Sequence, residues 1–143
     1  MSGIAAILLA VTLWGLAILH AYWGVGGRWP GADERSLARM VIGSKGIEHM
    51  PSAGACFAVT FVLTAAGILP LMAIGWVGAP WPFWLTLVGL SGCTLVFIGR
   101  GARSYVPAFR KFGPEEPFAT YDKRLYAPLC FALGAGFLFL LMW

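Results

Sequence analysis

The sequence predicts an all-α integral membrane protein, a bundle of four transmembrane helices with one short amphipathic helix in its first charged loop. Of its 143 residues, 59% are hydrophobic and 11% are charged, and the mean hydropathy is +0.80. A soluble domain has about 25% charged residues. Several apolar segments are long enough to cross a bilayer, and all basic residues lie between them. No polar linker separates two apolar blocks, so residues 1–143 should form a single transmembrane domain.

Each span follows from the length of an uncharged segment. Residues 4–23 carry no charge and match a hydrocarbon core about 30 Å thick at about 1.5 Å per residue. Residues 50–99 contain no Asp, Glu, Lys or Arg, a length suited to two crossings, and the Gly- and Pro-rich stretch 75–82 indicates the turn between them. The four predicted spans are residues 4–23, 51–74, 81–98 and 125–143.

The basic residues predict the topology. All ten Lys and Arg residues lie in loop one (residues 24–50) or loop three (residues 99–124). With four spans, both loops lie on the same face, and the positive-inside rule makes that face cytoplasmic and leaves both termini outside. Basic residues beside spans serve topology and anionic headgroups, so the net charge of +4 does not indicate a nucleic-acid partner. The tryptophans expected at the outer interface are Trp76, Trp81, Trp84 and Trp143.

The two loops differ in their expected structure. In loop one, Asp33 can cap a short helix on which Leu37, Met40 and Val41 share one side, so we expect an amphipathic helix in the headgroup region. An ordinary polar loop is the alternative. In loop three, prolines interrupt regular structure, and three phenylalanines are expected to turn toward the membrane: Phe109, Phe112 and Phe118.

Close contact between helices should involve small residues. Span three offers Gly89, Ser91 and Gly92, and span four offers Ala132, Gly134 and Gly136.

Two segments carry a resemblance to known proteins. They are HAYWGVGGRWP at residues 20–30 and PFATYDKRLYAPLC at residues 117–130. Together they resemble a family of small four-span bacterial membrane proteins that is known as a domain of unknown function. The resemblance extends over nearly the whole chain and implies a bacterial cytoplasmic (inner) membrane. It implies no catalytic residue.

Polar residues with chemical potential gather at the expected inner face. One interpretation is that they set the topology and anchor the helix ends. The other is a polar site above an apolar pocket, suited to a lipophilic substrate or ligand. In that site His20 and His49 are the candidate catalytic residues for proton transfer, and Asp122 would orient a histidine or pair with an arginine. The candidate ligand-binding residues are Tyr22, Glu48, Arg100, Arg103 and Tyr126.

Cofactor binding is a weaker hypothesis. His20 and His49 could ligate haem from two neighbouring helices. Cys56, Cys93 and Cys130 are predicted at a depth similar to that of His20, and three thiols with one imidazole could bind zinc. The alternative is that the cysteines are small apolar residues of membrane helices. Without a paired C-x-x-C motif, the sequence predicts no cofactor.

These observations leave three classes of function. We expect first a small binding or accessory protein whose cytoplasmic face recognises a lipid, a lipophilic small molecule or a partner subunit. The alternative is a small membrane enzyme acting on a lipophilic substrate through His20, His49 and Asp122. A haem or metal redox protein comes third. No ionisable residue lies near the middle of a predicted span, which disfavours a self-contained transporter, although a homo-oligomer could enclose a path.

Overall fold

A computed structural model describes residues 1–111 and 113–143, so the expectation for Phe112 lies outside the described residues. The described part of the chain forms helices and no strand, which confirms the predicted all-α class. Four helices are long and apolar enough to cross a membrane. The first three are α1 (Ser2–Gly24), α3 (Ala53–Ala73) and α4 (Phe83–Arg103). The fourth spans Phe118–Met142 and comprises α6 (Phe118–Tyr121), a π-helical turn η1 (Asp122–Tyr126) and α7 (Ala127–Met142).

The third and fourth long helices extend beyond the apolar segments predicted for them. α4 continues to Arg103, and the fourth helix begins at Phe118 instead of residue 125. Both extensions carry charged side chains. A prediction from apolar segments ends a span at the first charged residue, whereas the helical backbone continues through such residues. The extensions place Arg100 on α4 and Asp122 on the π-helical turn η1 of the fourth helix, and there the two side chains form an ion pair.

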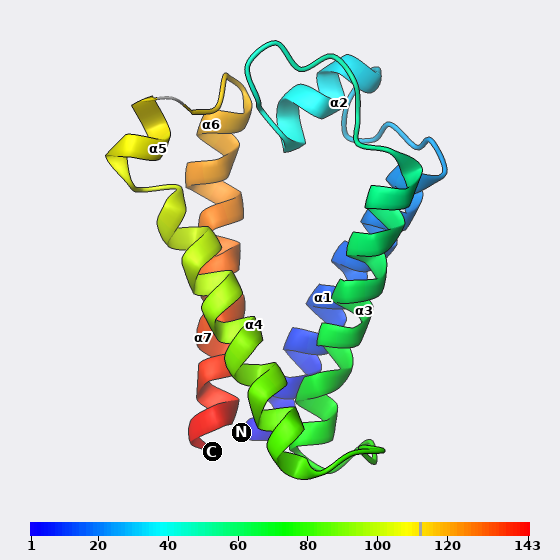
Figure 1. Ribbon diagram of the computed structural model, residues 1–143, viewed down its shortest axis with the longest axis vertical. Coiled ribbons are helices and arrows are strands. Elements are labelled where there is room, and N and C mark those ends of the chain that lie inside the picture. Colours follow the sequence, from blue (N-terminus) through cyan, green and yellow to red (C-terminus); the bar gives the residue numbers. More distant parts are fainter. Residues whose placement is uncertain (112) are drawn as a thin grey trace.

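The four long helices form two pairs. α1 packs mainly on α3, and α4 packs mainly on α7. Polar groups support the first pair: the indole of Trp14 donates to the Thr64 carbonyl (3.2 Å), and the Thr60 hydroxyl donates to the Ala17 carbonyl (3.3 Å). The two pairs approach each other where both termini lie and diverge toward the opposite end (Figure 1).

The apolar core joins the two pairs near the termini. It contains side chains from all four long helices: Ala6, Leu9, Leu13, Ala66, Leu90, Leu133, Phe137 and Leu140. Two of the predicted small residues permit this contact. A Cβ on Gly89 of α4 would lie 3.0 Å from Leu69 of α3, and one on Gly136 of α7 would lie 2.9 Å from Leu9 of α1. A Cβ on Gly134 would instead meet Ile98 of α4, within the second pair. The expectation for Gly92 was wrong, because a Cβ there would meet open space.

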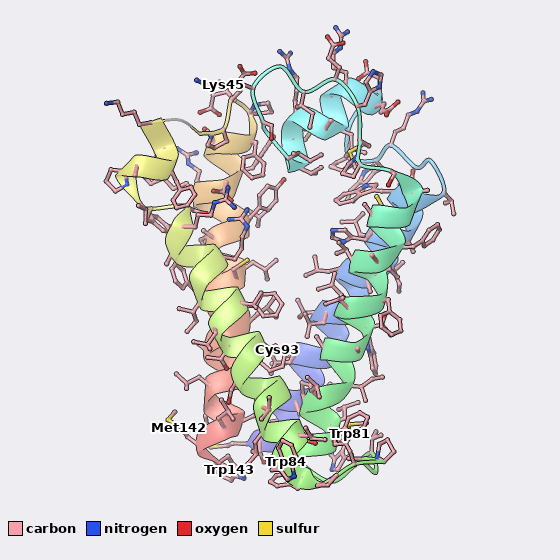
Figure 2. The ribbon with its side chains drawn as sticks, in the orientation of Figure 1. Lys45, Trp81, Trp84, Cys93, Met142 and Trp143 are labelled. Atoms are coloured by element: carbon pink, nitrogen blue, oxygen red, sulfur yellow. The ribbon has the colours of Figure 1, made fainter. Side chains whose placement is uncertain are left out.

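The two ends of the bundle differ in composition. Trp81, Trp84 and Trp143 lie at the end with the termini, and Lys45 lies at the other end (Figure 2). Loops one and three are both at the end with Lys45, together with α2 (Glu34–Val41) and α5 (Pro107–Lys111) (Figure 1). We call these the tryptophan end and the charged end.

The short helix of loop one forms as predicted. Asp33 accepts a hydrogen bond from the Ser36 backbone N–H (2.7 Å), and the Ser36 hydroxyl completes a capping box. That backbone hydrogen bond is the main reason why the pKa of Asp33 lies below its usual value. Leu37 is fully buried, and α2 contacts α6. The apolar side of α2 is therefore covered at least in part by protein.

Candidate functional site at the charged end

Loop contacts connect the two helix pairs at the charged end. The Tyr126 hydroxyl, from η1, donates to the Met40 carbonyl at the end of α2 (3.0 Å). The Glu115 backbone N–H donates to the Gly43 carbonyl (2.8 Å). Gly43 has φ +68°, and a Cβ there would overlap Phe118, so this approach of the loops requires glycine. The pairs are thus joined by the core at one end and by loops one and three at the other.

A pocket of about 720 Å³ lies between these loops. Loop one contributes one wall, and the C-terminal part of α4, loop three and the start of the fourth helix contribute the others. Its lining is partly charged and partly apolar: Val41, Ile42, Gly43, Ser44, Lys45, Arg100, Arg103, Ser104, Ala108, Phe109, Arg110, Gly113, Pro114, Phe118 and Asp122.

An ion pair is the most buried charged feature of this pocket. The Arg100 Nη2 lies 2.6 Å from Asp122 Oδ1, and Arg100 Nη1 donates to the Ser104 hydroxyl (2.9 Å). The Asp122 side chain is only 7% exposed, whereas that of Arg100 is 36% exposed. Of the partners that the sequence allowed for Asp122, the structure shows Arg100. Asp122 begins the π-helical turn η1, a type of distortion that is frequent at functional sites.

The other cationic side chains of the pocket have no carboxylate partner among the described residues. The Arg103 guanidinium lies 4.7 Å from the centre of the Phe109 ring. Arg110 donates to the Ser104 carbonyl (3.2 Å). Lys45 is exposed at the pocket wall. With Arg100 these make four cationic side chains against the single carboxylate of Asp122, a formal excess of three positive charges.

His20 lies on α1, below the loops. Its ring Nδ1 is 2.8 Å from the Leu16 carbonyl oxygen, and its ring meets Trp23 edge-on at 5.0 Å. By helical spacing His20 shares the α1 face of the core residues Leu9 and Leu13, which is the face turned toward the other helix pair. Tyr22 is partly exposed and packs beside Gly27. Neither residue lines the pocket.

Glu48 and His49 belong to a separate cluster that connects α2 to the start of α3. The Glu34 carboxylate accepts the Met50 backbone N–H (3.0 Å) and lies 3.5 Å from His49 Nδ1, while Arg35 pairs with Glu48 (3.0 Å). These side chains are largely exposed. Among the described residues, neither His20 nor His49 forms a hydrogen bond or ion pair with Asp122.

The cysteines are divided between the two helix pairs. Cys56 is buried on α3, whereas Cys93 and Cys130 lie on α4 and α7. Within residues 1–111 and 113–143, no three or more His, Cys, Asp or Glu side chains are grouped closely enough to hold a metal ion. The weaker hypothesis of a zinc site from His20 and the three cysteines is therefore not supported by the described residues, because these side chains belong to pairs that diverge toward the charged end (Figure 1).

Among the pocket residues that were not singled out from the sequence as site candidates, three contribute polar or charged groups to its contacts: Ser104, Lys45 and Arg110. Ser104 accepts hydrogen bonds from both Arg100 and Arg110, and Lys45 and Arg110 add positive charge to the pocket. Lys45 and Arg110 were visible as loop charges. Their meeting depends on how loop one folds over loop three, which their spacing in the sequence does not indicate.

The fold and site define a class: a helical multi-pass membrane protein with a basic pocket between its loops at one end. Residues 13–137 match the family described as "Protein of unknown function (DUF3995)", and the chain belongs to that family. This confirms the family resemblance that the two sequence segments indicated. No curated protein and no solved structure matches the chain.

Proposed function

We propose that this protein is a membrane binding protein whose charged-end pocket holds the polar head of a lipophilic ligand. The observation that carries the proposal is the pocket itself. Its walls come from both charged loops, and its lining combines arginines with apolar side chains such as Ile42 and Phe118. A ligand seated there would contact elements of both helix pairs. Such a site suits a molecule with a charged head and an apolar body.

The same pocket supports a second candidate, a small membrane enzyme. The buried Asp122 on a π-helical turn favours it, since carboxylates that line pockets are frequent acid–base groups. Chemistry would require proton transfer with His20, which lies deeper on α1. Incubation of purified protein with its own extracted ligands, followed by mass spectrometry, would reveal turnover. Loss of that turnover in His20→Ala and Asp122→Asn, at unchanged thermal stability, would favour the enzyme.

We infer that the charged end is cytoplasmic and that the membrane is the bacterial inner membrane. The confinement of all Lys and Arg residues to loops one and three supports the orientation. The resemblance carried by residues 20–30 and 117–130 supports the membrane. In a cysteine-free background, a cysteine at Lys45 should resist a membrane-impermeant reagent in intact cells. A cysteine added after Trp143 should be labelled. The reverse pattern would contradict this orientation.

A matched pair of variants tests the binding role. Ala108 lines the pocket and Ala102 does not, and both are exposed residues of neighbouring helical segments. Ala108→Trp would occupy part of the pocket, whereas Ala102→Trp adds the same side chain outside it. We expect lipid extraction and mass spectrometry to find a ligand enriched with the wild type and with Ala102→Trp, and depleted with Ala108→Trp. Equal lipid profiles for all three proteins would contradict the proposal.

A further inference from the structure

We propose that the charged-end pocket binds a phosphate group, presented by an anionic amphiphile or by a soluble phosphate ester. This inference rests on the binding role proposed above and names the chemistry of the head that the pocket takes.

The charge of the pocket favours a ligand with more than one negative charge. Asp122 neutralises Arg100, because their atoms are 2.6 Å apart. Lys45, Arg103 and Arg110 then face the pocket without a carboxylate partner among the residues that the structure describes. A phosphate monoester carries a charge of about −1.5 to −2 at neutral pH, whereas a carboxylate carries about −1. Phosphate therefore matches three cations better.

The arginines are held in a way that suits phosphate. The guanidinium carbon of Arg103 lies 4.7 Å from the centre of the Phe109 ring, a cation–π contact that leaves the N–H groups of Arg103 available as donors. Arg110 uses one N–H on the Ser104 carbonyl and keeps its other donors. Two oriented guanidinium groups offer paired donors that match phosphate oxygens, which a flexible ammonium does not.

The walls provide an apolar surface beside these donors. Val41 and Ile42 come from loop one, and Phe109, Pro114 and Phe118 come from loop three and the fourth helix. The apolar parts of α4 and α7 begin next to this surface, on the side of the pocket toward the tryptophan end, and the helices are long enough to cross a membrane. An acyl or isoprenoid chain attached to the phosphate could follow this surface into the bilayer. A soluble phosphate ester would use the same donors without that chain.

Titrations of the full-length protein in a neutral detergent test the proposal. The first ligand series compares short-chain phosphatidic acid with phosphatidylcholine of the same chain length, and the second uses inorganic phosphate and glycerol 3-phosphate. Binding is followed by native mass spectrometry. Arg103→Gln removes a pocket donor, and Arg124→Gln removes an exposed arginine that does not line the pocket. Thermal unfolding of both variants is measured as a control for their folding.

We expect wild type and Arg124→Gln to bind phosphatidic acid well above phosphatidylcholine, and Arg103→Gln to bind it roughly ten- to hundredfold more weakly, the range for a lost charge-assisted hydrogen bond. Comparable, Arg103-dependent affinity for glycerol 3-phosphate would identify a soluble ester as the source, and its absence would identify a lipid. Equal binding of the two lipids, or equal losses in both variants, would overturn the phosphate assignment. If a neutral ligand is still displaced by Ala108→Trp, the binding role stands and only this inference fails.

Discussion

Removing either partner of the Arg100–Asp122 ion pair should have unequal effects, and the difference follows from burial. In Arg100→Met, the Asp122 carboxylate would remain 7% exposed without its cation. In Asp122→Asn, Arg100 would keep its hydrogen bond to the Ser104 hydroxyl, and its side chain is already 36% exposed. The asparagine oxygen could also still accept from it.

The magnitudes follow from those two environments. Breaking a buried ion pair by removing one partner destabilises by about 3–5 kcal/mol, and because Arg100 is partly exposed we expect the lower end, about 3 kcal/mol, for Arg100→Met. For Asp122→Asn, weakening a single charge-assisted hydrogen bond should destabilise by about 1–2 kcal/mol. The double variant should recover part of the loss, since it leaves no unpaired charge, with a coupling energy of about 1–3 kcal/mol.

Equilibrium unfolding in mixed detergent micelles, followed by circular dichroism, gives the four free energies of this double-mutant cycle. The wild type, the two single variants and the double variant are measured in the same micelle composition. Equal destabilisation by the two single variants would refute the argument from unequal burial. Strict additivity in the double variant would refute the ion pair as an energetic unit.

Three further outcomes are expected. Gly134→Ala should destabilise the α4–α7 pair by about 1–3 kcal/mol through overpacking, whereas Gly92→Ala, in open space, should not; similar melting temperatures would contradict the packing. The pKa of Asp33 is lowered, so its cap should be fully formed above about pH 4 and lost as the pH falls through its folded pKa. An asparagine side chain can cap α2 but does not titrate, so the hydrogen-exchange protection of α2 in Asp33→Asn should not change as the pH falls. Loss of this protection at low pH in the variant, as in the wild type, would contradict the prediction. Tyr126→Phe should lose about 0.5–1.5 kcal/mol from the bridge between loops, and Tyr121→Phe, which has no side-chain hydrogen bond in the described structure, should lose less; equal effects would count against the bridge.

The fold was largely predictable because long apolar segments have few alternatives in a bilayer. Without water, backbone groups must bond within their own segment, so such a segment becomes a helix. The cap at Asp33 was predictable for a similar reason, since it depends on residues only three apart. The early start of the fourth helix was not, because its charged residues interrupt the hydropathy signal that defines a span.

Only part of the site could be predicted from the sequence. Arg100, Arg103 and Asp122 were candidates by their position at span ends, and the structure brings them to one pocket. His49 was assigned to the same site on its chemistry, but Glu34 holds it near the start of α3. Which loop residue meets which depends on how two loops separated by two spans fold against each other. No local pattern encodes that contact.

A density map of the protein purified with its native lipids would show whether the charged-end pocket holds a ligand. The proposed function predicts non-protein density between loops one and three, with its head beside Arg103 and an apolar tail along α4 and α7. A map in which those loops close over the pocket and exclude any ligand, with bound lipid only at the outer faces of the bundle, would contradict it.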